Sequence, residues 1–429
     1  MRSSMARSLA ASLTDVKYVL VDGGTRQAKA VMAKRGHRPN GPTTDFNPFD
    51  PAVLDDPYPA YRQLLAGPAV VYNPNIDLWV ISHRDAVRQA LRDHHILSSA
   101  ESVTRVRQRI PMMLTVDDPD HARMRPVFAR IFTPKAIIDQ RAIVERIVST
   151  GLDRIACGDD AVGALAIPLP VSVIAEMLGV PARDFHRFRR WSDRIVTGFE
   201  MQSIGSLRVI PQTLVAVARM RGLISSELRR PRGQDLLNSL QAAIRAGQLA
   251  EQEAFWFALL LLVAGNETTT NLLGTLLHAL AVHPDQYRML RDNPALIGTA
   301  VEEALRWIAP IQGFHRTALG NYGPIPRGAR VLLLFAAANR DPRHYERPDN
   351  FEITRAVSDH LSFGCGIHFC LGAHLARLEA RILLEQLVQS AEHIEELAAP
   401  QWSRNPTLRG PTSLKLRLHP RYSIRDDKP

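Results

Sequence analysis

The segment 251–283 is the feature that most constrains how this chain can fold. Its 33 residues have helical periodicity, and the middle is apolar with no polar face. A helix of this length spans about 50 Å at about 1.5 Å per residue. Because no side of its middle suits contact with water, we expect it to run through the centre of the protein, with other elements packed around it.

The same segment does not predict a membrane protein. Its longest apolar run, from Phe255 to Gly265, has 11 residues, whereas a transmembrane helix needs roughly 20. A secretory signal is not expected, because Asp15 and Lys17 interrupt the short apolar stretch near the N-terminus. The 3 cysteines are too few for a disulfide scaffold and indicate a reducing compartment. We therefore expect a globular, cytoplasmic protein with no membrane partner.

The remaining pattern predicts a mainly α protein with small β-sheets (α+β) near its two ends. Helical periodicity dominates from Pro134 to Pro284. Strands are few. Outside the helical region we expect a short helix over 59–65, a hairpin over 70–72 and 78–81, a buried strand over 330–337, a helix over 371–391 and a terminal hairpin over 407–418.

The positive charge of the chain is concentrated at its N-terminus. The net charge is +10, but residues 1–41 hold eight basic and two acidic side chains, so the rest carries only +4. This balance argues against a nucleic-acid partner. A turn-rich stretch at 39–42 marks the boundary, and we expect a flexible basic extension over 1–44 and a single domain over 45–429. The Ser- and Arg-rich start is also typical of organellar transit peptides, which leaves that alternative open here.

A glycine-rich loop around one thiol predicts the reactive site. In the run FGCGIHFCLG over 363–372, glycines at 364, 366 and 372 surround Cys370, and a helix follows. Glycines let a backbone pass flat against a planar ligand, and the positive end of the helix lowers the pKa of the thiol. A thiolate facing a flat ligand suggests haem iron. Zinc held by Cys365, His368, Cys370 and His374 is an alternative, although ligands two residues apart are poorly spaced for it.

The loop pattern Phe-Gly-x-Gly-x-His-x-Cys-x-Gly resembles the haem-binding loop of the cytochrome P450 family at every fixed position. The resemblance implies heme b (iron protoporphyrin IX) as cofactor, with Cys370 as the iron ligand and His368 as a partner of a haem propionate. Phe363, Gly364 and Gly372 would form the loop against the haem. A His at 368 is common in the bacterial soluble type, which argues against the transit peptide. The fold implied is that of the family, with a long central helix over the haem and the cysteine loop beneath it.

Further basic residues match the two propionates that a haem carries. The segment 118–126 resembles the family's third-helix motif, in which His121 and Arg125 reach the haem edge. Arg316, in the segment 314–318, resembles another propionate arginine. An isolated His or Arg on a helix is usually a solvated residue. Their order and spacing relative to the cysteine loop favour haem binding.

Two more motifs concern structure and oxygen chemistry. Glu303 and Arg306 fit the family's Glu-x-x-Arg pair, and Arg355 fits the arginine that completes a buried structural triad; a pair spaced in this way is weak evidence when it stands alone. The motif AGNETT over 264–269 resembles the oxygen-activation motif of the family's central helix.

Small residues at Ala264 and Gly265 would let that helix pass close over the haem. The resemblance implies that Thr268 is the hydrogen-bonding hydroxyl in oxygen activation and that Glu267 relays protons. For an isolated motif, a threonine bonded to its own backbone and a glutamate paired with an arginine would be the alternative.

The resemblance covers residues 45–418 and implies a haem-thiolate monooxygenase. Such an enzyme inserts one oxygen atom from dioxygen into a small, largely apolar organic substrate. Nothing in the chain resembles a flavin or nicotinamide domain, so we expect a separate ferredoxin and ferredoxin reductase as electron donors. A peroxide-driven haem-thiolate enzyme and a haem-binding sensor are the alternatives. Peroxide users often lack the acid–threonine pair.

The resemblance also places the substrate pocket, its lid and a docking surface. The expected pocket walls are Leu260, Val263, Ala264, Ile311, Gln312, Thr407 and Leu408. The lid is expected over 98–113, where Arg105, Arg107 and Arg109 are candidates for recruiting an anionic substrate. The docking surface for an acidic ferredoxin is expected at Arg123, Arg130, Lys135, Arg377 and Arg381.

Overall fold

The computed structural model describes residues 41–107, 109–180, 184–199, 210–229, 236–356 and 359–421. Most of the predicted N-terminal extension therefore lies outside the described residues. Its last residues, from Gly41, are described and belong to the folded part: Thr43 forms a β-bridge with Tyr72, and the Thr44 amide donates a hydrogen bond of 2.9 Å to the Tyr72 carbonyl. The described fold thus begins slightly before the expected boundary.

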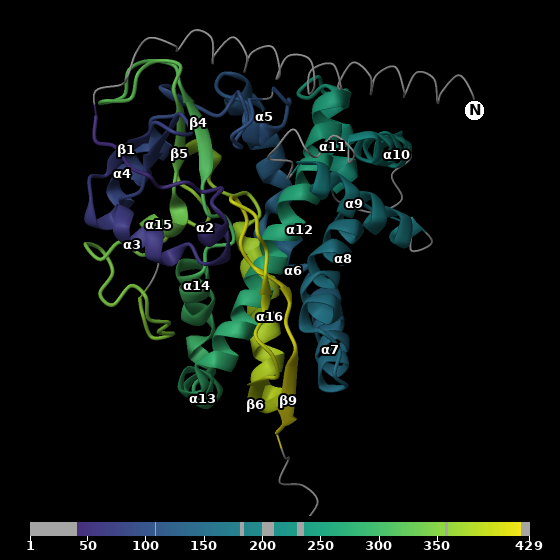
Figure 1. Ribbon diagram of the computed structural model, residues 1–429. Helices are drawn as coiled ribbons and strands as arrows, with labels where there is room; N and C mark the ends of the chain where they lie inside the picture. Colours follow the sequence, from purple (N-terminus) through teal and green to yellow (C-terminus); the bar gives the residue numbers. More distant parts are fainter. Residues whose placement is uncertain are drawn as a thin grey trace, which may run out of the picture.

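Helix α12 (Glu251–Val282) runs through the centre of the protein, as predicted. Of its 32 residues, 20 are buried. Helices α7 (Arg141–Ala156), α8 (Pro168–Met177), α9 (Phe185–Phe199), α10 (Ile210–Arg229) and α11 (Leu236–Arg245) lie on one side of it in Figure 1. It also packs against α14 (Ile297–Trp307) and α16 (Ala373–Ser390). None of the helices in the described ranges combines the length and the hydrophobicity of a membrane span.

The larger sheet lies to the other side of α12 and has five strands in the order β1-β2-β5-β4-β3. The strands are β1 (Val70–Asn73), β2 (Leu78–Ile81), β3 (Leu97–Ser98), β4 (Phe314–Ala318) and β5 (Arg330–Leu333). The predicted β1–β2 hairpin is confirmed. Helices α2 (Pro51–Asp55), α3 (Tyr58–Ala66) and α4 (Arg84–Arg92) belong to the same part of the chain.

The prediction of one strand over 330–337 is wrong in its second half. Strand β5 ends at Leu333, and the chain then forms the short helix α15 (Phe335–Ala338), in which the Ala338 amide donates to the Leu334 carbonyl. Both elements are fully buried, and a short buried apolar run has the same composition in a strand and in a helix.

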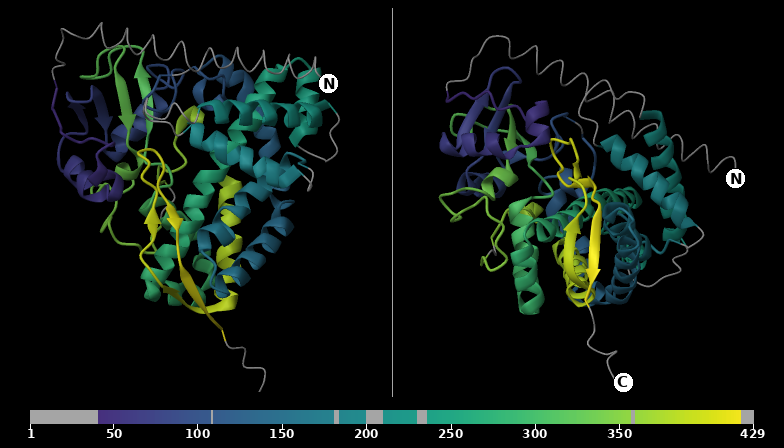
Figure 2. Two further views of the ribbon diagram at one scale, coloured as in Figure 1. Left: turned by 45° about the vertical axis from the view of Figure 1, so that its right-hand side comes forward. Right: turned by 60° about the horizontal axis from the view of Figure 1, so that its bottom comes forward.

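The terminal hairpin predicted over 407–418 is also wrong. Strand β8 (Pro411–Ser413) pairs with β7 (Gln401–Trp402), whereas β9 (Leu416–Pro420) pairs with β6 (Ala391–Glu396). The two halves of the expected hairpin therefore belong to different two-stranded sheets. The β6–β9 ribbon lies at the lower end of the molecule in both views of Figure 2.

The predicted buried triad is present in the structure. Glu303 and Arg306 on α14 are fully buried and joined by two hydrogen bonds, of 2.7 Å to Oε2 and 2.8 Å to Oε1. The Nε of Arg355 lies 3.3 Å from the Glu303 Oε1. The remaining donors of Arg306 bond three backbone carbonyl groups between residues 339 and 350. The triad thus ties α14 to the loop that leads to the cysteine loop.

The remaining helices complete the surroundings of the site. Helix α5 (Asp120–Ala129) carries the third-helix motif, α6 (Pro134–Ile138) packs against α16, and α13 (Pro284–Asp292) follows α12. The rings of Phe128 on α5 and Phe257 on α12 are stacked, with 3.7 Å between their centroids. Helix α5 is thereby fixed against the central helix.

Candidate functional site

A cavity of about 330 Å³ lies where α12, the cysteine loop, the start of α16 and strand β4 meet. Most of its lining side chains are apolar. Sixteen of the predicted site residues line it: Arg125, Leu260, Val263, Ala264, Gly265, Glu267, Thr268, Ile311, Arg316, Phe363, Gly364, His368, Cys370, Gly372, Thr407 and Leu408. The sequence motifs, which lie up to hundreds of residues apart, therefore converge on one cavity.

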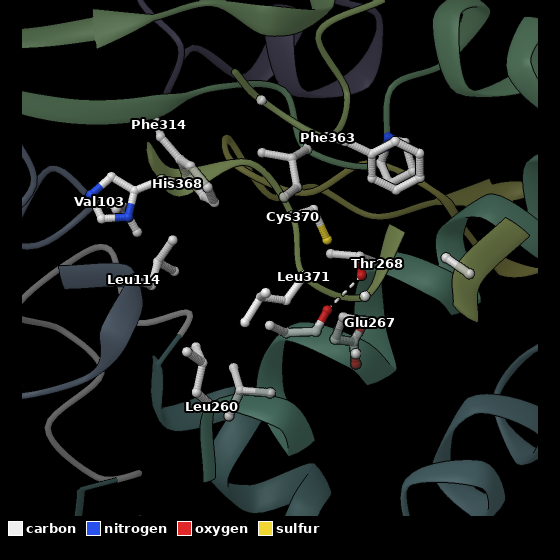
Figure 3. Close-up of a pocket in the computed structure, with 18 of the residues that line it drawn as sticks. Val103, Leu114, Leu260, Glu267, Thr268, Phe314, Phe363, His368, Cys370 and Leu371 are labelled. Carbon is white, nitrogen blue, oxygen red and sulfur yellow. Dashed lines mark hydrogen bonds between the residues drawn. The ribbon is translucent and has the colours of Figure 1, made fainter. Parts of the chain in front are cut away.

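The cysteine loop is held in shape by its backbone. The Cys370 amide donates a hydrogen bond of 3.0 Å to the Phe363 carbonyl, and the Gly364 amide donates one of 2.9 Å to the Leu361 carbonyl. Gly366 has a φ of +75°, and a Cβ there would lie 2.8 Å from a backbone oxygen of α4. Only glycine suits that position. In Figure 3 the Cys370 sulfur points toward the part of α12 that carries Thr268.

The electrostatics of Cys370 differ from the prediction. Burial raises the pKa of the thiol, and this effect outweighs the amides of Gly372 and Ala373 and the charges of Arg125 and Arg377, which all lower it. The helix end therefore acts in the predicted direction, but it does not by itself produce a thiolate. A sulfur that is open to the cavity, with amides and cations near it, is well suited to bind a metal cation, which stabilises the thiolate form.

Four basic side chains gather at one edge of the cavity. Burial lowers the pKa of Arg316 to about 10. Burial, followed by the charge of Arg316, lowers the pKa of His368 to about 2. Burial and the charge of Arg125 also lower the pKa of His121. Cationic forms are thus disfavoured here by desolvation and by mutual repulsion, and a ligand bearing carboxylates would relieve both.

His121 lies one layer behind the wall rather than in it. Its ring contacts that of His368, with 4.5 Å between the centroids, and its Nε2 is buried without a hydrogen-bond partner in the described part of the chain. Such an unpartnered buried nitrogen suits a carboxylate acceptor. The sulfur, the flat loop and this basic edge together fit an iron porphyrin with two propionates.

On α12, Thr268 and Glu267 both line the cavity, opposite the cysteine loop. The Thr268 hydroxyl donates a hydrogen bond of 2.5 Å to the Ala264 carbonyl, which is the alternative considered for an isolated motif. Its oxygen still has lone pairs that can accept a hydrogen bond from a ligand. A Cβ at Gly265 would lie 2.7 Å from the Cδ1 of Ile174, so this glycine also allows α8 to pack closely.

The prediction that Gln312 lines the substrate pocket is wrong. Gln312 is buried behind the wall, where its Oε1 accepts a hydrogen bond of 2.8 Å from the Tyr61 hydroxyl and its Nε2 donates one of 2.7 Å to the Ala309 carbonyl. Its amide therefore joins the segment after α14 to α3. The preceding residue, Ile311, lines the cavity and forms a β-bridge with Leu408.

Part of the wall was not indicated by the sequence. It comes from α8 and from the lid segment, and it includes Ile174, Met177, Met112 and Met113. The positions of Ile174 and Met177 follow from how α8 packs on α12, which periodicity alone does not show. Glu379 on α16 was missed as well. It lines the cavity while 2% exposed, and burial raises its pKa to about 8.

Two of the three predicted lid arginines have other partners. The Arg105 guanidinium donates a hydrogen bond of 2.5 Å to the Ile76 carbonyl. Arg107 bonds the Glu101 carboxylate and the Gly328 carbonyl, at 2.7 Å each. Arg109 is exposed. The lid arginines are thus absent from the described lining of the cavity, and the structure gives no support to anion recruitment by them.

Two of the five predicted docking cations are also engaged. Arg123 pairs with Glu253, and Arg377 pairs with Glu302 at 2.6 Å. Arg130, Lys135 and Arg381 are exposed, as predicted. The zinc alternative does not hold within the described ranges, where no three side chains of the Cys, His, Asp and Glu types are grouped as metal ligands.

Comparison with known proteins agrees with this geometry. A family model described as Cytochrome P450 matches residues 295–415. A Beta-dihydromenaquinone-9 omega-hydroxylase of Mycobacterium tuberculosis is 40% identical over 392 residues, covering 89% of this chain and 80% of its own length. Cytochrome P450 monooxygenase PikC of Streptomyces venezuelae is 35% identical over 409 residues, covering 90% of this chain and 96% of its own length.

The fold is shared with solved structures. Cytochrome P450 CYP109Q5 from Chondromyces apiculatus has 32% sequence identity and a TM-score of 0.79, covering 88% of this chain and 99% of its own. The sequence motifs, the cavity that they form and the extent of these similarities lead to one assignment. The chain belongs to the cytochrome P450 family of monooxygenases, whose members bind heme b through a cysteine thiolate.

Proposed function

We propose that Cys370 binds the haem iron and that the cavity beside it receives a neutral, largely apolar organic substrate, into which one oxygen atom from dioxygen is inserted. The observation that carries this proposal is the chemistry of the wall. Among the described residues, its cationic groups are Arg125 and Arg316, and both belong, with the neutral His368, to the basic edge that suits the propionates. An anionic substrate would have no further cation of this wall to pair with.

The apolar part of the wall supports the same substrate class. Met112, Met113, Ile174, Met177 and Leu260 present aliphatic and thioether surface. Burying apolar surface contributes roughly 25 cal/mol per Å². Methionine side chains adapt to differently shaped ligands. One relative is named as the hydroxylase of a dihydromenaquinone, which also supports an apolar substrate.

Bound haem supplies dioxygen binding and transfer of one oxygen atom. The chain's own residues would orient dioxygen by a hydrogen bond and deliver protons to it. We assign Thr268 the role of hydrogen-bond partner at its Oγ1, and Glu267 the role of passing protons from water toward that hydroxyl. Both side chains lie opposite the cysteine loop. Their presence favours dioxygen over peroxide as oxidant, because a peroxide-driven reaction has less need of delivered protons.

We propose a ferredoxin and its reductase as electron donors in the cytoplasm. The docking surface is revised to Arg130, Lys135 and Arg381, three exposed cations on neighbouring elements. An acidic partner would be attracted by this surface. Electron transfer should slow as the ionic strength rises, and a rate independent of salt would contradict this docking surface.

The substrate class is tested by difference spectroscopy on the haem-loaded protein. Pairs of ligands with the same apolar chain, one ending in an alcohol and one in a carboxylate, should differ in affinity. We expect the alcohol to displace water from the iron and to bind at least about tenfold more tightly, a difference of about 1.4 kcal/mol. Tighter binding of the carboxylates would contradict the proposal. The family's red-shifted Soret band under carbon monoxide checks the thiolate ligand independently.

A further inference from the structure

A second carboxylate on α14 is bound by residues on either side of the cysteine loop, Arg377 on α16 and His360. Glu302 directly precedes Glu303 of the buried triad. Unlike Glu303, it faces α16. Its carboxylate accepts two hydrogen bonds from Arg377, of 2.6 Å from Nε and 2.7 Å from the terminal nitrogen, and it lies 3.0 Å from the Nε2 of His360. Burial by itself raises the pKa of Glu302, but the bonds from Arg377 and His360 bring it down to about 2. Glu302 is therefore a firmly ionised carboxylate.

Arg377 connects this carboxylate to the iron ligand. Its guanidinium lies over the ring of Phe363, 4.5 Å from the centroid. The Phe363 carbonyl accepts the hydrogen bond from the Cys370 amide. The side chain of Arg377 is 27% exposed and that of Glu302 is 17% exposed, so solvent screens the pair only in part. A continuous set of contacts thus runs from Glu302 through Arg377 and Phe363 to Cys370.

We propose that Glu302 is a positioning residue for the iron ligand. Through Arg377 it holds the Phe363 ring beside Cys370, and by neutralising Arg377 it helps to set the reduction potential of the haem iron. A bidentate carboxylate fixes the plane of a guanidinium, and a fixed guanidinium fixes the ring that it stacks on. This role rests on the proposed function of Cys370 as the iron ligand. It adds a residue on α14 that influences the iron ligand without touching it.

The sign of the electrostatic effect follows from the charges. Reduction adds one negative charge at the haem. Without the carboxylate of Glu302, Arg377 is left as a net positive charge near the thiolate, which favours the ferrous form and raises the potential. Without Arg377, the carboxylate is left as a net negative charge, which lowers the potential. The two single substitutions must therefore have opposite effects, and the double substitution must largely cancel them.

The test is a reductive titration of the haem-loaded protein with a chemical reductant, in the absence of any protein partner. We expect Glu302→Gln to shift the ferric–ferrous equilibrium toward ferrous by on the order of tenfold, about 59 mV for a one-electron couple. Arg377→Gln should shift it in the opposite direction, and the double variant should lie close to the wild type. Glu385→Gln is the matched control. Glu385 also lies on α16 and pairs with an arginine, Arg141, at 2.7 Å, but none of its described contacts involves the cysteine loop.

Shifts of both single variants in the same direction, or no shift in either, would overturn the proposal. If Glu302→Gln fails to hold haem, the proposal is tested by comparing the reduction potentials of Arg377→Lys and Arg377→Gln. The lysine keeps the charge but loses the two-pronged bond, so its potential should stay near that of the wild type, and equal shifts in these two variants would overturn the proposal. A normal carbon monoxide band in the variants shows that the thiolate assignment stands whichever way the potentials move.

Discussion

The buried triad allows a quantitative prediction for Glu303→Ala. Arg306 is fully buried, and the substitution removes both of its bonds to the Glu303 carboxylate. The substitution also removes the acceptor of the Glu352 amide, at 3.0 Å, and the partner of Arg355. Removing one member of a buried ion pair costs roughly 3–5 kcal/mol, because the other charge stays buried and uncompensated.

That cost is a large part of the stability of the folded state, which is about 5–15 kcal/mol for ordinary domains. A loss of about 4 kcal/mol raises the unfolded fraction roughly a thousandfold, since each 1.4 kcal/mol is a factor of about ten. The loop beyond residue 339 is held by Arg306 and leads to Cys370. We therefore expect Glu303→Ala to yield little haem-loaded protein.

The assay combines the carbon monoxide difference spectrum, which counts haem-loaded chains, with urea denaturation, which gives the free energy of unfolding. Glu385→Ala is the control, because it breaks an exposed pair with Arg141 that is worth at most about 1 kcal/mol. Normal haem occupancy in Glu303→Ala, with a free energy of unfolding within about 1 kcal/mol of the wild type, would refute the reasoning.

Three further predictions concern the site and its walls. Thr268→Ala should still bind substrate but divert reducing equivalents to hydrogen peroxide; an unchanged ratio of product to electrons consumed would remove Thr268 from the mechanism. Gln312→Ala leaves the Tyr61 hydroxyl buried and unpaired, which should cost roughly 1–3 kcal/mol in urea denaturation with no change in substrate affinity; weaker binding at unchanged stability would return Gln312 to the pocket. For Glu379, burial raises the pKa from 4.5 to about 8, so stability should fall as pH rises between these values. Glu379→Gln should remove that part of the pH dependence, and an identical slope in both proteins would count against it.

The sequence predicts most reliably what is contiguous. The cysteine loop is one ten-residue run, and the central helix is one uninterrupted apolar segment, so their motifs and bounds are readable directly. Only the family resemblance led to the expectation that His121, Arg125 and Arg316 bind haem propionates. The structure then shows that His121 stands behind His368 rather than beside it in the wall.

What could not be predicted depends on partners far away in the chain. The Gln312 amide bonds Tyr61, 251 residues earlier, and the docking role expected for Arg377 is altered by Glu302 on another helix. The same reason explains the error in the terminal hairpin, where adjacent strands choose partners outside the segment. Local patterns specify which element forms, whereas the side that an element presents depends on the tertiary packing.

The way the cavity is assembled has a consequence for how enzymes of this kind diversify. The stretch that carries the proposed iron ligand, Cys370, is a single short one, 363–372, whereas other parts of the wall are contributed by the segment 102–115 and by α8, α12 and the turns near 310 and 407. Single substitutions in these dispersed segments can change the shape of the cavity. The stretch 363–372 and the contacts that hold it stay unchanged. Selection, in nature or in the laboratory, can therefore explore new substrates on this scaffold without putting its chemistry at risk.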